Sequence, residues 1–185
     1  MLLDFDIEKA TAAAAYLIER KGGEENMFVL IKTLYYADRS ALIKWGKTIT
    51  GDSFVSMPKG PVLTEVYNLF KGVGDFEYQA EWDACFSEKV NHSIHLLCPA
   101  SVDLLSEREM EVLEEARKQV NRFAPWLVSR WLHEVCPEWQ DPKGSSMPIE
   151  PELILRNAGR TDEEIQLIEE SNRTYDQTKR LLGIF

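Results

Sequence analysis

Cysteine is scarce in this sequence. Among 185 residues there are three cysteines, Cys85, Cys98 and Cys136, and no two of them form a Cys-x-x-Cys pair. An odd count without such a pair excludes a disulfide framework and a zinc ribbon as the basis of the fold. We therefore predict three reduced thiols, as in a cytosolic protein.

Long apolar runs and an excess of basic residues are also missing. No run approaches the ~20 residues of a membrane span. The N-terminal segment places acidic residues before its apolar part, whereas a signal peptide begins with basic residues. The 21 basic residues are outnumbered by 31 acidic ones, which gives a formal net charge of -10. These features predict a soluble, cytoplasmic protein that binds neither a membrane nor nucleic acid directly, and they favour a basic protein partner.

The sequence also lacks a complete motif for a cofactor, a metal ion or a nucleophile. The triplet Gly46-Lys47-Thr48 resembles the end of a phosphate-binding loop, but Ala41 stands where that loop requires its first glycine. The series His92-x-x-His95-x-x-Cys98 has metal-binding residue types. In a strand, however, this spacing sends neighbouring members of the series to opposite faces. We therefore expect no cofactor, no metal ion and no catalytic residue.

The composition is that of an ordinary globular protein. Hydrophobic residues make up 44% and charged residues 28% of the chain, which excludes a wholly disordered protein. The chain is also long enough to bury a hydrophobic core without disulfide bonds or metal ions. Helical periodicity dominates. We predict an α+β fold, a mostly helical single domain with a small antiparallel sheet packed among helices. The domain is expected to span 1–185, with 160–185 as a C-terminal helical extension.

Capping residues and apolar periodicity predict the individual elements. Ser106 with Glu109, and Thr161 with Glu164, form capping boxes, and Pro61 suits the first position of a helix. The helices predicted on these grounds are 7–21, 25–45, 62–71, 106–123, 126–135, 152–157 and 161–182. The predicted strands are 54–57 and a hairpin made by 76–85 and 89–97.

One acidic residue, Asp38, interrupts the apolar stripe of the second predicted helix. The apolar members of that stripe are Met27, Ile31, Leu34, Leu42 and Trp45. A carboxylate facing a core must be hydrogen-bonded, because stranding even a neutral polar group there costs about 2–7 kcal/mol. We expect a structural tie rather than a catalytic acid. The donors that the sequence offers are Lys32, Tyr35, Arg39, and the backbone N–H groups of the turn at Gly51 or of the helix after Gly60-Pro61.

His133 is the histidine with the clearest alternative roles. It lies near the end of a tryptophan-rich helix, and we expect a hydrogen-bonded packing role, since no neighbouring serine or cysteine makes it half of a catalytic pair. One alternative function for the whole chain is a hydrolase-like enzyme using Asp38 and His133, which requires the two side chains to lie within hydrogen-bond reach at a pocket.

A second alternative function is that of a phage-associated structural or regulatory interaction protein, which would form a defined homo-oligomer.

Several short segments carry a resemblance to a known family. They are 32–39 (KTLYYADR), 49–52 (ITGD), 59–62 (KGPV), 131–134 (WLHE), 137–139 (PEW) and 147–149 (MPI). These segments resemble the Panacea domain of the SocA-like antitoxins, a family that includes phage-associated GepA-type proteins. The resemblance extends from about Ile7 to Leu155, and Thr33 stands where the family more often has leucine.

The resemblance implies a non-catalytic antitoxin that binds and neutralises a cognate protein toxin. In the SocA type, the antitoxin is an adaptor that delivers its toxin to a protease, so a ClpXP-type protease is a second implied partner. Some family members carry an additional DNA-binding domain, which we do not expect here because little chain precedes Ile7. The acidic balance is consistent with a basic toxin, since complementary charge speeds encounter.

Within this resemblance, two groups of residues are candidates for the binding site. The residues expected to hold the crossing that shapes the binding surface are Asp38, Arg39, Gly60 and Pro61. The candidate toxin contacts are Tyr35, Tyr36, His133 and Trp139, because aromatic residues are frequent interface hot spots. The alternative is that all of them belong to the core. We favour the core for Asp38, Gly60 and Pro61, and both alternatives stay open for Tyr36 and Trp139.

Overall fold

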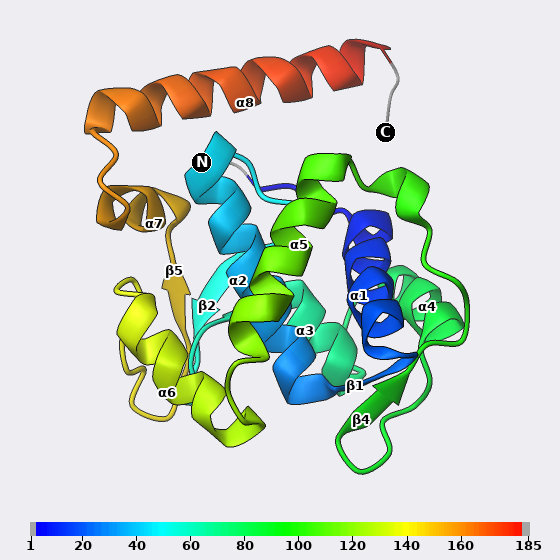
Figure 1. The fold of residues 1–185 in the computed structure, drawn as a ribbon. Helices are drawn as coiled ribbons and strands as arrows, with labels where there is room; N and C mark the ends of the chain where they lie inside the picture. The colour runs from blue at the N-terminus through cyan, green and yellow to red at the C-terminus, as the bar shows by residue number, and fades with distance from the viewer. Residues whose placement is uncertain (1–2, 183–185) are drawn as a thin grey trace.

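The computed structural model describes residues 3–182. Over this part of the chain, eight α-helices, one short 3-10 helix and five short strands form a mostly helical α+β fold (Figure 1). The strands make two small antiparallel sheets rather than the single sheet predicted. The predicted fold class is confirmed, with a second sheet added.

Helix α2 (Met27–Trp45) lies at the centre of the fold and packs against α1 (Ile7–Lys21) and, more extensively, against α5 (Glu107–Val120) (Figure 1). It begins two residues later than predicted, because Asn26 accepts hydrogen bonds from two backbone N–H groups of the first turn and caps the helix. A run of small buried residues lets α1 approach its neighbours closely. They are Ala10, Ala12, Ala13, Ala14 and Ala15.

The larger sheet joins the segment after α2 to a segment near the end of the chain. Strand β2 (Phe54–Ser56) lies between β3 (Val62–Leu63) and β5 (Met147–Ile149), both antiparallel to it. Three buried residues pair across this sheet, Leu63, Phe54 and Ile149. Strand β2 was predicted, whereas β3 and β5 were not.

The smaller sheet corrects the predicted hairpin. Strand β4 (Ser93–His95) lies within the predicted strand 89–97, but its partner is β1 (Glu24–Asn26), directly before α2. Residues 76–85 form helix α4 (Phe76–Cys85), so the first strand of the predicted hairpin is wrong. Here tertiary packing and a helix cap decide the local structure.

Helix α4 follows from a cap and a buried indole. Asp75 accepts a hydrogen bond from the N–H group of Glu77 and so caps the first turn. Trp82 is 2% exposed and packs edge-on against Phe70 and in a tilted contact against Phe86. The spacing of Trp82 and Phe86 is four residues, which places both on one side of a helical turn. The apparent alternation in the sequence concealed this spacing.

The third predicted helix also begins later than expected. Helix α3 spans Thr64–Lys71, and the two residues before it belong to β3. Pro61 is therefore not in the first helical position, and that prediction is wrong. The cap comes from Asp52, whose carboxylate oxygens accept hydrogen bonds from the N–H groups of Glu65 at 3.0 Å and Val66 at 2.9 Å.

The capping boxes predicted for the second half of the chain are confirmed. Ser106 and Glu109 form the box at the start of α5. Thr161 and Glu164 exchange hydrogen bonds at the start of α8 (Asp162–Leu182). The remaining elements are η1 (Val102–Leu104), α6 (Pro125–Val135) and α7 (Pro151–Asn157).

Helix α8 runs across one end of the molecule (Figure 1). Ile165 is buried, and the side-chain amide of Asn172 donates a hydrogen bond to the carbonyl oxygen of Gly46 at 2.7 Å, directly after α2. The expected extension 160–185 therefore contains a helix that contacts the core, and its last three residues lie outside the described part of the chain. The division into a domain and an extension stays a prediction.

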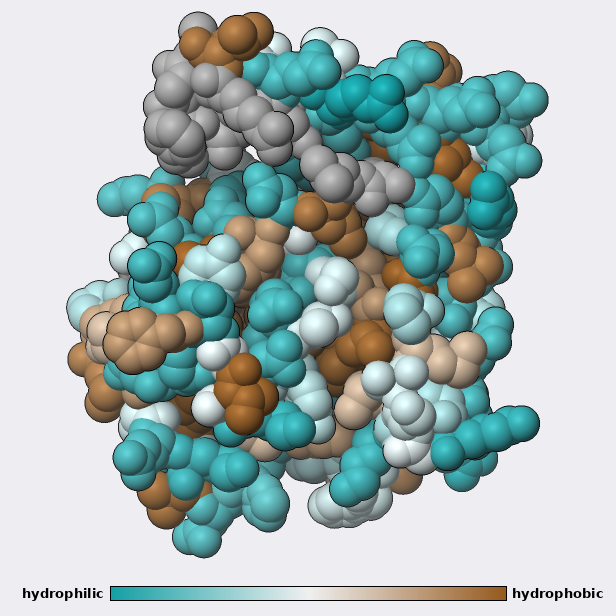
Figure 2. Space-filling view, turned by 180° about the vertical axis from the view of Figure 1, so that it is seen from behind, coloured by the Kyte–Doolittle hydropathy of each residue, from teal (hydrophilic) through white to brown (hydrophobic). Residues whose placement is uncertain are grey.

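The surface of the described residues is mixed. On the face shown in Figure 2, apolar side chains lie in small groups separated by hydrophilic ones. Two of the exposed apolar residues are adjacent at the start of α6, Trp126 at 78% and Leu127 at 43% exposure. Between residues 3 and 182, no helix combines the length and the apolar character needed to cross a membrane.

Candidate functional site

Helix α2 carries several polar side chains on its buried face. Lys32 and Asp38 are each 1% exposed, and Tyr35 is 0% exposed. Polar groups are buried at a large cost unless they are hydrogen-bonded, and each of these bonds to a segment from elsewhere in the chain. We define two clusters by these contacts. The Asp38 cluster contains Asp38, Ile49, Thr50 and Asp52, and the His133 cluster contains Lys32, Gly60, Pro61, His133 and Trp139.

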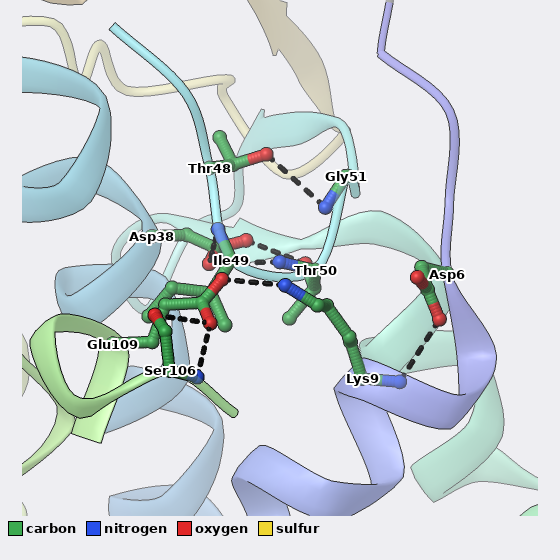
Figure 3. A network of polar contacts seen from close by, with 9 residues as sticks. All are labelled: Asp6, Lys9, Asp38, Thr48, Ile49, Thr50, Gly51, Ser106 and Glu109. Atoms are coloured by element: carbon green, nitrogen blue, oxygen red, sulfur yellow. Dashed lines mark hydrogen bonds and ion pairs between the residues drawn. The ribbon is translucent and has the colours of Figure 1, made fainter. Parts of the chain in front are cut away.

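The Asp38 carboxylate is held by the segment that follows α2 (Figure 3). One oxygen accepts hydrogen bonds from the N–H groups of Ile49 at 2.9 Å and Thr50 at 3.2 Å, and the other accepts from the Thr50 hydroxyl at 2.5 Å. The prediction that Asp38 faces the core and is tied by backbone N–H groups near Gly51 is confirmed. The side chains also considered as donors bind other partners.

Burial dominates the ionisation of this cluster. Removal from water raises the pKa of Asp38 to about 7, while the hydrogen bonds from Thr50 and Ile49 oppose the rise. Burial likewise raises the pKa of Asp52 to about 6, against the hydrogen bonds it accepts at the start of α3. Asp52 also carries a charge that raises the pKa of Asp38 further. Asp38 thus binds backbone N–H groups of the turn after α2, and Asp52 binds backbone N–H groups at the start of α3.

The turn that holds Asp38 is itself clamped by the N-terminal segment. The N–H group of Asp6 donates to the carbonyl oxygen of Thr50 at 2.8 Å. Gly51 has φ +69°, and a Cβ atom there would lie 1.8 Å from the carbonyl oxygen of Asp4. Lys9 on α1 forms an ion pair of 2.6 Å with Glu109 on α5 near this turn (Figure 3). Only glycine fits this position, because it tolerates the left-handed conformation and leaves room for the crossing backbone.

A second acid, Glu138, connects α2 to the loop after α6. Its side chain is 0% exposed and accepts a hydrogen bond from the Tyr35 hydroxyl at 2.7 Å. Arg39 approaches with two nitrogens, Nε at 2.5 Å and Nη2 at 3.3 Å. Burial, with Cys136 and Glu138 nearby, raises the pKa of Tyr35 well above its ordinary value. The sequence argument missed this acid, although the family-like segment 137–139 contains it.

Lys32 ties the His133 cluster to α2. Its ammonium group donates hydrogen bonds to the carbonyl oxygens of Gly60 and Pro61, both at 2.8 Å. Burial lowers the pKa of Lys32 to about 7. Gly60 has φ +91°, and a Cβ atom there would lie 3.4 Å from both Lys32 Nζ and His133 Nε2. These contacts position the Gly-Pro segment between α2 and α6.

His133 and Trp139 stack on each other at the outer side of this cluster. Their ring centroids are 3.6 Å apart with an interplanar angle of 10°, and the Trp139 Nε1 donates to the carbonyl oxygen of Met57 at 3.0 Å. Both residues are half-buried. The His133 Nε2 is buried and has no hydrogen-bond partner among the described residues. The predicted packing of His133 is therefore observed, whereas a hydrogen bond to this nitrogen, which was also predicted, is not observed among the described residues.

Burial lowers the pKa of His133, and the nearby Lys32 cation lowers it further. The imidazole is therefore mainly neutral at pH 7. A neutral ring stacks on an indole without bringing a charge into contact with Lys32. The helix C-terminus, which would favour a protonated ring, does not decide the charge here.

A third group of aromatic residues is partly exposed between α2, α5 and α6. We call Tyr36, Phe123 and Trp131 the aromatic surface. Trp131 contacts Tyr36 with centroids 4.9 Å apart and stacks on Phe123 at 5.1 Å. All three side chains are half-buried. Aromatic groups fixed by their neighbours and still reachable from solvent are suited to anchor a protein partner.

The structure sorts the predicted site residues into these groups. Four of the eight, Gly60, Pro61, His133 and Trp139, come together in the His133 cluster. Tyr35 and Arg39 meet at Glu138, and Asp38 lies in its own cluster. Tyr35 is fully buried, so it contributes to the scaffold and is not accessible as a toxin contact. Tyr36 belongs to the aromatic surface.

The pairing of Asp38 with His133 that an enzyme would need is not observed. In residues 3–182, the hydrogen bonds of the Asp38 carboxylate go to Ile49 and Thr50, whereas His133 packs on Gly60 and Trp139. The described residues also contain no group of three histidine, cysteine, aspartate or glutamate side chains that could hold a metal ion. The observed chemistry of the site is hydrogen bonding and packing.

The fold and the site together define a class of protein. It is a mostly helical α+β protein in which buried polar residues of one central helix hold three connecting segments and leave aromatic groups at the surface. The family model described as "Antitoxin SocA-like, Panacea domain" matches residues 30–140, more than half of the chain, and both clusters lie within the match. The chain belongs to this family. No curated protein and no solved structure matches it.

Proposed function

We propose that this chain is a non-catalytic antitoxin that acts in the cytoplasm by binding and neutralising a cognate protein toxin. Membership of the SocA-like Panacea family supports antitoxin function in general. The observation that carries the mode of action is the arrangement of α2. Its one acid, Asp38, and the buried Lys32 are occupied by structural hydrogen bonds, whereas the aromatic side chain of Tyr36 on the same helix stays partly accessible.

We place the toxin contact on the aromatic surface and the His133–Trp139 stack. Trp131 on α6 contacts Tyr36 on α2, and His133 lies two positions further along α6. Interfaces depend on a few rigid aromatic anchors surrounded by groups that contribute less. Trp131, Tyr36 and Trp139 have their rings fixed by neighbours before any partner arrives, which lowers the entropic cost of binding.

The charge of the chain supports a basic toxin. A formal net charge of -10 attracts a positively charged protein and accelerates association at low ionic strength. The association rate of antitoxin and toxin is therefore expected to fall as salt is raised. An unchanged rate between low and physiological salt would argue against a basic partner.

The test is co-expression with the product of the adjacent gene, provided that this product is toxic alone. Wild-type chain is expected to restore growth, and Tyr36→Ala is expected to weaken the rescue while the protein stays folded by circular dichroism. Leu167→Ala is the matched control, because Leu167 on α8 is also an apolar residue at the surface, 65% exposed. Equal loss of rescue in both variants, or none in Tyr36→Ala, would contradict the proposed surface.

The same strains distinguish direct neutralisation from delivery to a protease. An adaptor shortens the lifetime of the toxin only in cells that contain the ClpXP-type protease, whereas a direct inhibitor leaves it unchanged. Toxin half-life with and without the protease gene separates the two. If no neighbouring product is toxic and the purified chain forms a defined homo-oligomer, the structural or regulatory alternative replaces the antitoxin proposal.

A further inference from the structure

Two of the three cysteines, all predicted to be reduced thiols, lie together in the fold. Cys85 is the last residue of α4, and Cys98 follows β4. Both thiols are free, and their sulfur atoms are 2.6 Å apart. The backbones are held side by side, because the N–H group of Leu97 donates to the carbonyl oxygen of Cys85 at 2.8 Å. The third thiol, Cys136, lies in the core.

We propose that Cys85 and Cys98 are an oxidation site that forms an intramolecular disulfide bond. The oxidant is a peroxide. In the first step one thiol is oxidised to a sulfenic acid while hydrogen peroxide is reduced and releases one water molecule. The second thiol then attacks the sulfenic sulfur, the sulfur–sulfur bond forms and the hydroxyl leaves as a second water molecule. Two thiol hydrogens are lost and both peroxide oxygens end in water.

The backbone around the pair supports closure without rearrangement. A disulfide requires Cα atoms within about 7 Å and side chains that point toward each other. The two backbone segments run side by side next to the cysteines, where the N–H group of Ser87 donates to the carbonyl oxygen of His95 at 2.9 Å and Phe86 bridges to Leu96. The sulfur contact itself shows that the side chains converge.

A surface concavity gives a small oxidant access to the two thiols. It has a volume of about 240 Å³ and lies between α1, α4 and the segment around η1. Cys85 and Cys98 both line it, together with Glu8, Thr11, Ala12, Ala15, Glu81, Pro99, Ser101 and Leu104. Thr11 is 6% exposed, and its hydroxyl has no hydrogen-bond partner among the described residues. The two thiols are the cysteine side chains that line this concavity.

The chemistry of the pair points to a slow structural crosslink rather than a rapid peroxide sensor. Burial, the Cys98 thiol and the charge of Glu81 raise the pKa of Cys85 to about 11. A fast sensor needs a thiolate at neutral pH. Cys136 is different, because burial raises its pKa to about 12 and it is 0% exposed. We therefore expect oxidation to be selective for the Cys85–Cys98 pair.

Closing the bond would anchor the segment that leads into α2. Residues between the two cysteines include β4, and β4 pairs with β1 directly before the central helix. A crosslink that closes a loop of about 15 residues lowers the unfolding equilibrium constant on the order of 100-fold, since it restricts the unfolded chain. The oxidised protein should therefore unfold at a higher temperature than the reduced protein.

The experiment treats the purified full chain with hydrogen peroxide and digests it with trypsin without reduction. Lys89 lies between the two cysteines, so cleavage there leaves them on separate peptides that only a disulfide joins. We expect a linked peptide containing Cys85 and Cys98, an intact mass lower by two hydrogen atoms, and a raised melting temperature that a reducing agent reverses. The variant Cys136→Ser should behave as wild type, and Cys98→Ser should show neither the link nor the thermal shift.

Each other outcome would overturn the proposal. Sulfinic acid at either cysteine without a link would mean that the second thiol does not reach the first. A link between two chains, or a link to Cys136, would mean that the observed proximity does not direct the reaction. A linked peptide without a raised melting temperature would refute the anchoring of β4. The experiment needs no toxin, so its result is independent of the proposed antitoxin function.

Discussion

The two clusters along helix α2 use buried polar groups in different ways. In the Asp38 cluster, both carboxylate oxygens accept hydrogen bonds, and the turn that supplies the donors is clamped by the N-terminal backbone. In the His133 cluster, Lys32 is satisfied by two carbonyl groups, but a neighbouring imidazole nitrogen is buried without a partner in the described part of the chain, and the outer rings are half-buried. The first cluster is closed, and the second reaches the surface.

This difference separates scaffold from surface. A fully satisfied buried network fixes one backbone arrangement, because each alternative leaves a polar group without a partner. The unsatisfied Nε2 of His133, beside partly exposed aromatic rings, does not fix a backbone arrangement in this way. His133 should therefore tolerate substitution or contact with a partner protein. Substitutions at the Asp38 cluster and at Glu138 should therefore cost stability, whereas substitutions at the outer side of the His133 cluster should cost little.

The largest expected effect is at Glu138, which binds Tyr35 and Arg39 of α2. Glu138→Ala removes the partner of a mostly buried guanidinium group and of a buried phenol, so we expect a loss of about 3–5 kcal/mol in the free energy of unfolding. Urea denaturation measures it. The control is Glu115→Ala, whose partner Lys44 is 45% exposed, and it should stay within about 1 kcal/mol of wild type. Similar losses in both variants would contradict the central role of Glu138.

The next effect is at Gly51. Gly51→Ala combines a left-handed residue with a clash against the Asp4 backbone, so we expect a loss of about 2–5 kcal/mol. Gly72→Ala is a matched control, because its φ of +68° equals that of Gly51 within a degree and no atom lies within 4 Å of the added Cβ. Gly72→Ala isolates the conformational cost of about 1–2 kcal/mol. Equal losses would show that the N-terminal clamp is absent.

Asp38 should make stability depend on pH in an unusual direction. Its pKa is about 7 in the folded protein and 3.8 when unperturbed. Between these values the folded state holds a proton that the unfolded state has released, so the free energy of unfolding rises as the pH falls from 7 toward 4. The contribution of Asp38 to the free energy of unfolding is therefore complete below about pH 4 and is lost as the pH rises through 7.

The variant Asp38→Asn isolates this contribution. Relative to the variant, the wild type should gain up to about 2.5 kcal/mol between pH 7 and pH 5 in urea denaturation. Asp52, with a pKa of about 6, acts in the same direction and leaves a smaller slope in the variant. If the two proteins show parallel pH profiles, Asp38 is ionised in the folded protein and the assignment is wrong.

The smallest effect is expected at His133. His133→Phe keeps an aromatic ring on Trp139 and removes the buried nitrogen that lacks a partner among the described residues, so the free energy of unfolding should change by less than about 0.5 kcal/mol. Chemical denaturation near pH 7.5 measures it. A loss above about 1.5 kcal/mol would mean that this nitrogen has a structural partner, and the contrast between the two clusters along α2 would no longer hold.

Local signals predicted much of this fold and part of its site. The stripe on α2 predicted a buried Asp38, and the capping residues at Ser106 and Thr161 predicted two helix starts, because these depend on neighbours within a few residues. The partners of Tyr35 and Arg39 could not be predicted, since Glu138 is 99 residues from Arg39 in the chain. Helix α4 was misassigned because its packing on Phe70 outweighed the local alternation.

We propose that Asp38 belongs to the scaffold and does not contact the toxin. Calorimetric measurement of toxin affinity for Asp38→Asn and Tyr36→Ala, each confirmed to be folded, tests it most directly. We expect the dissociation constant of Asp38→Asn to stay within about twofold of wild type and that of Tyr36→Ala to rise by about tenfold or more. A folded Asp38→Asn protein that no longer binds the toxin would contradict the account.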